Sequence, residues 1–275
     1  MSTRHHTSAL SARDTCLDAD LKLLIDAVGE AGDLAMTFFG HAPRTETKPD
    51  GTSVSEADFA VDALLKERLI SGGGSYGWLS EESEDNLDRL GKSRVWVVDP
   101  IDGTRAFLKG KPEWTISAAL VEDGRPRLAA VFNPATGEFY QAARGSGAFL
   151  NGTRIAVPEP VQLEGCRLAA SAAQFRPGRW DRPWPEIETV WVNSIAYRLA
   201  LVAAGKCDGT VSLSGKSDWD VAAAHLLVDE AGGVVTTHRG QPLVYNRENT
   251  RHSSIVSAGP ALHAALIERT LHATI

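Results

Sequence analysis

Two short acidic segments hold the side chains of this sequence that are best suited to chemistry. Ser80-Glu81-Glu82-Ser83 and the run Asp99-Pro100-Ile101-Asp102-Gly103-Thr104 place four carboxylates and a threonine hydroxyl close together along the chain. Hard divalent cations such as Mg²⁺ bind oxygen ligands in near-octahedral geometry and keep positions open for water and a substrate phosphate. The two segments therefore predict a magnesium site that can handle phosphate groups.

Each acidic segment follows an apolar run that is typical of a buried strand. Trp78-Leu79 leads into Glu81, and Val95–Val98 leads into Asp99. Buried strands read as continuous hydrophobic runs, and functional side chains often follow their carboxyl ends. Because charges removed from water must be paired or coordinated, acids at these strand ends favour a bound cation.

The turn from Asp99 to Thr104 offers further ligands. Asp99 and Asp102 are aimed at one point, and the Ile101 carbonyl between them is left without a strand partner, so it can serve as a third oxygen ligand. Asp102-Gly103-Thr104 is expected to open a helix, and the free N–H groups of a helix N-terminus hold phosphate oxygens. Asp102 alone would be an ordinary helix cap, but its cluster with Glu81 favours a ligand.

Ordinary structural roles compete for three other acids. Asp58 stands three residues after Ser55, which is the spacing of a capping box, and Asp218 and Asp220 both stand at the start of a helix. Since one cap suffices for that helix, one of the two is free for another role. The residues by themselves leave these alternatives open.

Helices and strands alternate in a pattern that predicts a mixed α and β protein. Apolar residues at helical spacing predict a helix from Leu21 to Phe39 and a second one capped by Ser55 and extending to Leu69. Hairpin signals favour an antiparallel meander after the second acidic segment. The remaining expected elements are strands Thr115–Val121, Arg127–Phe132, Glu138–Ala142, Gly209–Leu213, Val234-Val235 and Ile255-Val256, and helices Ser194–Ala204 and Asp220–Glu230.

Composition excludes several classes of function. The chain has 275 residues and a net charge of −7, with no basic block, so a nucleic acid polymer is not an expected partner. No apolar run reaches the length of a membrane helix, so no stable membrane insertion is expected. Residues 1–17 are expected to form a flexible tail without a secretory signal. Three cysteines far apart in the chain fit a reducing cytoplasm.

Three of these motifs together resemble the inositol monophosphatase superfamily. They are Glu81-Glu82-Ser83, the run from Trp96 to Thr104, and Trp219-Asp220 followed by Glu230-Ala231-Gly232-Gly233, and the resemblance extends from about Leu21 to the C-terminus. It implies a layered αβαβα sandwich of the inositol monophosphatase and fructose-1,6-bisphosphatase type. Residues 18–155 would form an α+β half, and residues 156–275 an α/β half that supplies Asp220.

The resemblance also assigns roles to individual residues. Two or three Mg²⁺ ions per site are implied, the first bound by Glu81, Asp99 and the Ile101 carbonyl, the second by Asp99, Asp102 and Asp220, with Glu81 also reaching a third. Asp58 and Thr104, together with Glu81, would activate the attacking water, while Glu82 would support the site from behind. The residues implied in substrate binding are Asp102, Gly103, Thr104, Lys216 and Asp220.

Within the superfamily, the stretch from Asp102 to Lys109 and on to Ile116 looks most like the bacterial 3′(2′),5′-bisphosphate nucleotidases of sulfur assimilation. These enzymes convert adenosine 3′,5′-bisphosphate to AMP and phosphate. An inositol-1-phosphate or other sugar-phosphate phosphatase shares every metal ligand, and a non-catalytic binding relative is the third hypothesis. Inhibition by Li⁺ and a homodimer are further implications. Relatives commonly have Pro-Val-Thr where this chain has Ser53-Val54-Ser55, and glycine where it has Ser80.

A bisphosphate substrate needs a second anion site and a surface for the base. The candidates for the anion site are Arg105, Lys109, Lys111, Arg176 and Lys216, and those for the base are Trp180, Trp184, Tyr197 and His225.

Overall fold

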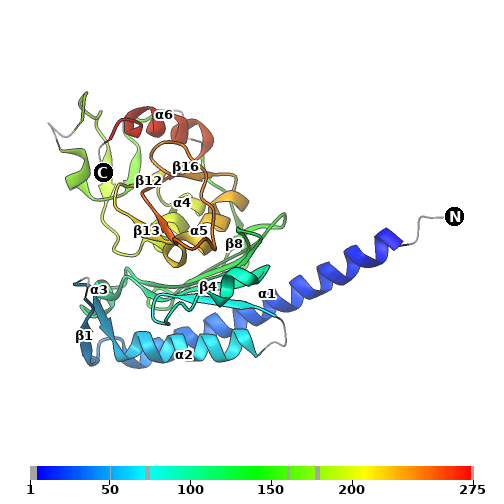
Figure 1. The fold of residues 1–275 in the computed structure, drawn as a ribbon. Coiled ribbons are helices and arrows are strands. Elements are labelled where there is room, and N and C mark those ends of the chain that lie inside the picture. The colour runs from blue at the N-terminus through cyan, green and yellow to red at the C-terminus, as the bar shows by residue number, and fades with distance from the viewer. Residues whose placement is uncertain (1–4, 50, 72–74, 160–161, 177–179, 274–275) are drawn as a thin grey trace.

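A computed structural model describes residues 5–49, 51–71, 75–159, 162–176 and 180–273, and five layers are stacked in it (Figure 1). Helices α1 (His5–Phe38) and α2 (Glu56–Ile70) cover the outer face of a seven-stranded sheet. Helices α4 (Ile195–Ala203) and α5 (Asp218–Glu230) lie between this sheet and a five-stranded one, and α6 (Pro260–Thr270) covers the far face of the second sheet. The expected αβαβα sandwich is confirmed.

The seven-stranded sheet holds the first half of the chain and the predicted meander. Its order is β3-β4-β5-β6-β7-β8-β9, with β3 and β4 parallel and all other neighbours antiparallel. The strands are β3 (Gly77–Ser80), β4 (Arg94–Asp102), β5 (Thr115–Glu122), β6 (Arg125–Asn133), β7 (Glu138–Ala143), β8 (Gly147–Leu150) and β9 (Thr153–Ile155).

The five-stranded sheet holds the second half, in the order β11-β10-β12-β16-β14. Its strands are β10 (Arg167–Ala169), β11 (Glu188–Val190), β12 (Gly209–Ser212), β14 (Val234–Thr236) and β16 (Ile255–Ala258). Two short ladders stand apart, β1 (Thr45–Thr47) with β2 (Ser53–Ser55) and β13 (Lys216–Ser217) with β15 (Arg251–His252). The short helices are η1 (Asp88–Gly91), α3 (Thr104–Phe107) and η2 (Ala172–Phe175).

The continuous apolar sequence of strand β4 is explained by its burial on both faces of the sheet. Trp96 and Val98 pack under α1 and α2, whereas Val95 and Val97 pack against the layer of α4 and α5. A strand covered on both faces has no solvent side, so every position favours a hydrophobic residue. Gly32 of α1 allows the helix to approach this sheet, because a Cβ there would overlap the ring of Phe132.

Two boundaries differ from the sequence-based expectation. Helix α1 begins at His5, so residues 5–17 are helical where a tail was expected; Met1–Arg4 lie outside the described residues. No proline or glycine between His5 and Cys16 stops the helix from continuing toward its N-terminus, and this end projects beyond the sheet (Figure 1). Helix α5 begins at Asp218, not Asp220, because Ser217 is its cap. None of the described helices is long and apolar enough to cross a membrane.

Candidate active site and metal centre

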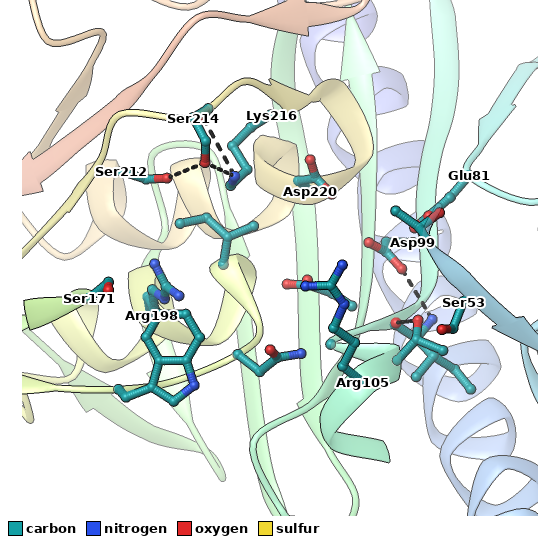
Figure 2. Close-up of a pocket in the computed structure, with 18 of the residues that line it drawn as sticks. Ser53, Glu81, Asp99, Arg105, Ser171, Arg198, Ser212, Ser214, Lys216 and Asp220 are labelled. Atoms are coloured by element: carbon teal, nitrogen blue, oxygen red, sulfur yellow. Dashed lines mark hydrogen bonds between the residues drawn. The ribbon is translucent and has the colours of Figure 1, made fainter. Parts of the chain in front are cut away.

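A cavity of about 500 Å³ opens where the two halves of the chain meet. Figure 2 shows Glu81 and Asp99 on one side of it and Arg198 and Ser171 on the other, with Lys216 and Asp220 between them. The full lining is Thr52, Ser53, Glu81, Asp99, Ile101, Asp102, Gly103, Thr104, Arg105, Ser171, Gln174, Trp191, Asn193, Ile195, Arg198, Ser212, Leu213, Ser214, Lys216 and Asp220.

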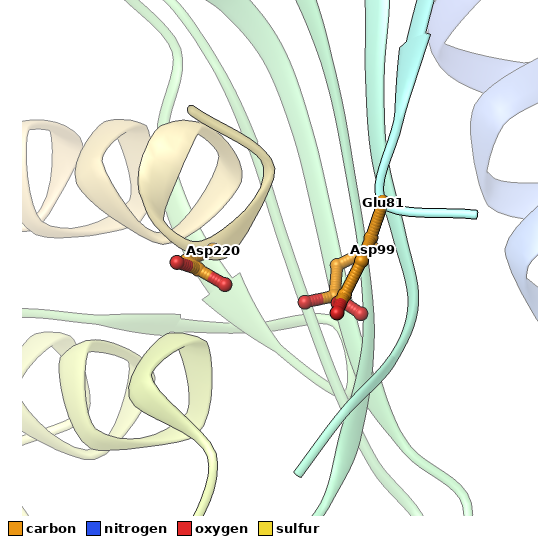
Figure 3. A group of neighbouring side chains, drawn as sticks. All are labelled: Glu81, Asp99 and Asp220. Carbon is orange, nitrogen blue, oxygen red and sulfur yellow. The ribbon is translucent and has the colours of Figure 1, made fainter. Parts of the chain in front are cut away.

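Three carboxylates form the acidic end of the cavity. Glu81, Asp99 and Asp220 each place one carboxylate oxygen within 4.8 Å of the other two (Figure 3). Glu81 and Asp99 are neighbours because β3 and β4 are parallel and pair Ser80 with Val98, so both chains leave the sheet at the same edge. Asp220 comes from the first turn of α5 in the other half. The cluster therefore closes only when the two halves pack.

Asp99 is the fully buried member of this cluster. It is 1% exposed, its Oδ1 accepts a hydrogen bond from the Ile101 N–H at 3.1 Å, and its Oδ2 is buried without a partner among the described residues. Burial and the neighbouring acids, Glu81 first among them, raise the pKa of Asp99 well above its ordinary value. A buried oxygen without a donor, facing other acids, fits a bound cation.

Asp102 lies in the same cavity but is anchored across the interface between the halves. Its Oδ2 accepts hydrogen bonds from Ser194 Oγ and from the Ala196 N–H, both at 2.6 Å, at the start of α4. Burial raises the pKa of Asp102 to about 6 despite these two donors. One carboxylate oxygen is thus occupied by α4, and Oδ1 makes no such contact with the described residues.

Asp220 acts both as a helix cap and as a cluster member. Its Oδ2 accepts a hydrogen bond from the Ser217 N–H at 2.6 Å in a capping box, and burial together with the charge of Asp102 raises its pKa to about 7. Asp218 is turned away from the cavity and contacts His252 and the Asn246 N–H. The choice between the two acids, which the sequence left open, falls to Asp220.

Asp58 likewise combines two arrangements that the sequence presented as alternatives. Its Oδ2 accepts hydrogen bonds from the Ser55 N–H and Oγ, at 2.8 and 2.6 Å, which is the capping box of α2. Its Oδ1 lies 3.3 Å from Thr104 Oγ, which also reaches the Ile101 carbonyl at 3.1 Å. Burial raises the pKa of Asp58, so this carboxylate is a stronger base than an exposed one.

Gly103 lets the chain turn sharply between Asp102 and α3. Its φ is +100°, and a Cβ there would lie 2.9 Å from the Glu113 carbonyl oxygen and 3.3 Å from Ser194 Cβ. Only glycine adopts this conformation in this space without strain.

Lys48 is a site neighbour that the sequence did not indicate. From the loop between β1 and β2, its Nζ donates to Glu81 Oε1 at 3.0 Å and to Glu82 Oε1 at 2.7 Å. Burial raises the pKa of Glu82 to about 7, while the hydrogen bond from Lys48 acts in the opposite direction. Lys48 was missed because it precedes Glu81 by thirty-three residues in a short polar loop with no chemical motif.

Two cations line the cavity beyond Asp220, on the side away from Glu81 and Asp99. Arg198 is 7% exposed and donates to the Val192 carbonyl at 2.7 Å, and Lys216 Nζ donates to Ser214 Oγ at 2.9 Å. In the part of the chain that the structure describes, neither has a carboxylate within ion-pair distance. The ring of Trp191, 59% exposed, lies 4.9 Å from the Arg198 guanidinium.

The side chains that face the substrate were predicted from the sequence less accurately than the acids. Arg105 and Lys216 line the cavity, but Lys109, Lys111 and Arg176 are exposed and are not among its described lining residues. The four aromatic candidates also lie elsewhere: Trp184 packs against Trp180 and Phe175, Tyr197 contacts Glu138, and His225 contacts Tyr245. Arg198 and Trp191 take their place in the cavity.

Arg198 and Trp191 were not predicted from the sequence, although one signal for Arg198 exists. Arg198 is the only charged residue in α4, whose other residues are apolar or aromatic and buried. A buried cation without a counter-charge in an otherwise apolar helix is costly, and such a residue indicates a ligand site.

Comparison with known proteins agrees with this fold. The profile of the inositol monophosphatase family matches residues 17–273. An inositol-1-monophosphatase from Rhizobium meliloti is 36% identical over 230 residues, which cover 80% of this chain and 86% of that protein. A histidinol-phosphatase from Chlorobaculum parvum is 32% identical over 254 residues, covering 90% and 95%. The structure of an IMPase from Thermotoga maritima superposes with a TM-score of 0.78 at 30% identity, covering 91% and 96%.

The layered αβαβα sandwich places this chain in the structural class of the phosphatases to which it is similar. The chain belongs to the inositol monophosphatase family. Members are phosphoric monoester hydrolases that depend on a metal, typically Mg²⁺.

Proposed function

We propose that this phosphatase is a Mg²⁺-dependent 3′(2′),5′-bisphosphate nucleotidase that converts adenosine 3′,5′-bisphosphate to AMP and phosphate. The observation that supports it is the charge pattern of one cavity: the carboxylates of Glu81, Asp99 and Asp220 lie on one side, and beyond Asp220 lie Arg198 and Lys216, two cations with no ion-pair partner among the described residues. Hydrolysis of one ester releases one phosphate, while the second phosphate stays on the product. The retained phosphate needs a counter-charge, and the two cations offer it.

The acidic end fits Mg²⁺ in its donor set. All its donors are oxygens, as Mg²⁺ prefers, and the unpartnered Asp99 Oδ2 is the kind of atom that a cation satisfies. Glu81, Asp99 and the Ile101 carbonyl would hold one ion, and Asp99, Asp102 and Asp220 a second. When bound, such ions stabilise negative charge on phosphate oxygens and lower the pKa of water.

Asp58 and Thr104 are placed to handle the proton of the attacking water. Ser55 occupies one oxygen of Asp58, which leaves Oδ1 for the Thr104 hydroxyl. As Thr104 Oγ accepts a proton from water, its own proton moves to Asp58 Oδ1. The water oxygen then bonds to phosphorus as the P–O bond to the ribose breaks. The ribose oxygen takes a proton from solvent water, inorganic phosphate is released, and Asp58 returns its proton to solvent. The amides of Gly103 and Thr104 are candidate donors to the phosphate being transferred.

The opposite end suits the rest of a nucleotide. Lys216 and Arg198 would contact the retained phosphate, and the exposed ring of Trp191 offers a surface for the base. Stacking of a base on an aromatic ring contributes on the order of 1–3 kcal/mol. Burial lowers the pKa of Lys216, while the charge of Asp220 raises it.

Inositol 1-phosphate is the second candidate substrate, because the relative from Rhizobium meliloti is named an inositol-1-monophosphatase. Its ring carries hydroxyls but no second anion, so both cations would remain without a counter-charge. Histidinol phosphate, named by another relative, carries an ammonium group that Arg198 and Lys216 would repel. The charge of the cavity therefore favours the bisphosphate over both.

Phosphate release in Mg²⁺, with and without Li⁺, tests this choice on matched substrates. Adenosine 3′,5′-bisphosphate and 3′-AMP differ only in the retained phosphate, so the ratio of their kcat/KM values isolates its contribution. We expect the bisphosphate to be preferred about 10–100-fold, as a charge-assisted hydrogen bond of about 1.5–3 kcal/mol predicts. A large preference for inositol 1-phosphate, fructose 1,6-bisphosphate or histidinol phosphate would refute the proposal.

A variant of Lys216 tests whether this side chain causes the preference for the bisphosphate over 3′-AMP. Lys216→Met should lower kcat/KM for the bisphosphate about tenfold and leave the value for 3′-AMP within about twofold. Lys109→Met is the matched control, since Lys109 is exposed and is not among the cavity lining. Equal losses on both substrates would show that Lys216 does not contact the retained phosphate.

A further inference from the structure

A buried arginine connects the loop that follows Glu81 with a loop that contacts the first residue of α5, the helix that carries Asp220. Arg89 of η1 is 1% exposed. Its Nε and Nη2 donate to both oxygens of Asp85 at 3.0 and 2.7 Å, and its Nη1 donates to Asn246 Oδ1 at 2.8 Å and to the Arg247 carbonyl at 3.1 Å. The guanidinium thus connects the loop after β3 with the loop before β15, which belong to different halves of the chain.

Each end of this connection leads to a carboxylate of the cluster. Asp85 follows Glu81 by four residues in the loop after β3. At the other end, the backbone N–H of Asn246 donates to Asp218 Oδ2 at 2.8 Å. Asp218 is fully buried, is the first residue of α5 and precedes Asp220 by two residues. His252 Nε2 holds the other oxygen of Asp218 at 2.8 Å.

The backbone around Arg89 is shaped to hold this arrangement. Gly77 of β3 allows η1 to lie against the strand, because a Cβ there would come within 2.9 Å of Arg89 Cβ. Leu87 and Asn246, on the two sides of the guanidinium, have φ values of +65° and +54°. A leucine in this left-handed region is strained and persists only where its surroundings fix it.

We propose that Arg89 is a positioning residue that sets the separation of Glu81 from Asp220, and through it the affinity for the divalent cation. The inference rests on the proposed binding of Mg²⁺ by these acids. Mg²⁺ requires near-ideal geometry at its oxygen ligands, and Glu81 and Asp220 come from elements in different halves. Arginine suits the role because its planar fork binds two partners in fixed directions.

Mg²⁺ binding by calorimetry and the Mg²⁺ concentration for half-maximal activity test the proposal. Groups that hydrogen-bond metal ligands directly contribute about 10–100-fold to metal affinity. Because Arg89 acts through intervening residues, Arg89→Met should weaken Mg²⁺ binding about tenfold, while kcat at saturating Mg²⁺ stays within about threefold. Asn246→Gly keeps the left-handed backbone and the N–H to Asp218 but removes the contact with Arg89, so it should give a smaller shift in the same direction. Arg89→Lys should recover part of the affinity.

Arg94→Met is the control for simple loss of a partly buried arginine. Arg94 is 21% exposed and contacts Glu122 and Asp20, at the end of β4 away from the cluster. It should lower thermal stability without changing Mg²⁺ affinity. If Arg89→Met or Asn246→Gly lowers stability but leaves Mg²⁺ affinity unchanged, Arg89 is only structural and the proposal fails. If the wild-type protein binds no Mg²⁺, the proposed metal chemistry and this inference both fall.

Discussion

Asp62 Oδ2 accepts a hydrogen bond from Ser83 Oγ at 2.6 Å. The other oxygen of Asp62 accepts one from Ser80 Oγ, so a single buried carboxylate of α2 holds the residues on both sides of Glu81-Glu82. Ser80 thus makes a contact that glycine, expected at this position from the family resemblance, could not make. The turn that carries Glu81 is therefore held by hydrogen bonds to α2, the helix that also carries Asp58.

Asp62→Ala should lower kcat/KM about 10–100-fold, because a displacement of about 1 Å at a catalytic group has an effect of this size. The two serines would also lose their acceptor, at a cost of about 1–3 kcal/mol in the free energy of unfolding. Steady-state kinetics and urea unfolding measure the two effects. Glu67→Gln, an exposed change on the same helix, is the control. Activity close to wild type in Asp62→Ala would show that the turn keeps its shape without this contact.

Asp99→Asn should fold and lose phosphatase activity, since an amide would be a poor replacement for a carboxylate that we propose to hold two cations. In the absence of metal the same variant should be more stable than wild type, because it removes a buried charge that faces Glu81, Asp102 and Asp220. Thermal unfolding in EDTA at pH 8 measures this. Asp123→Asn, in an exposed turn with φ of +50°, should change neither property. Retained activity of Asp99→Asn at saturating Mg²⁺ argues against the site.

The acidic part of the site could be predicted because its residues stand at the ends of recognisable strands. Glu81 and Asp99 follow apolar runs, and parallel pairing of β3 and β4 brings them together. The approach of Asp220 depends on how α5 packs between the two sheets, which no local pattern in the chain indicates. Only the resemblance to known proteins joined it to the other two.

The substrate end could not be predicted from local pattern for a different reason. Trp180 and Trp184, in a loop rich in proline and tryptophan, were predicted to contact the base. In the structure Trp184 packs against Trp180 and Phe175 instead. Trp191 is a single residue after β11, and nothing beside it in the sequence marks it. Its place in the cavity depends on the tertiary contact between its ring and the Arg198 guanidinium of α4.

The stability of the metal-free protein should fall as pH rises from about 5 to about 8. Burial raises the pKa of Asp102 to about 6 and the pKa values of Asp220 and Glu82 to about 7. The unfolded chain ionises these groups near pH 4, whereas the folded chain must ionise them at higher pH against burial, so the folded state binds more protons over this interval. Urea unfolding in EDTA at several pH values measures the slope.

Mg²⁺ should remove much of this slope, because a cation compensates the carboxylates that must ionise. Asp220→Asn should also make it shallower in EDTA, by removing one of the groups with a raised pKa. Asp123→Asn again is the control and should leave the slope as it is. A metal-free protein that becomes more stable between pH 5 and pH 8 is incompatible with this electrostatic description of the site.

Gly103→Ala should destabilise the protein by about 1–3 kcal/mol, the usual cost of a residue forced into a sparsely populated backbone conformation. Two effects add at this position, since φ is +100° and the new Cβ would lie 2.9 Å from the Glu113 carbonyl. Gly110→Ala separates them, because Gly110 has a φ of +64° with no atom within 4 Å of the new Cβ. Urea unfolding should show a larger loss for Gly103→Ala than for Gly110→Ala, together with lower activity for Gly103→Ala alone. Equal losses would mean that the chain around Gly103 relaxes, and that close packing against Glu113 and Ser194 does not fix the turn between Asp102 and Thr104.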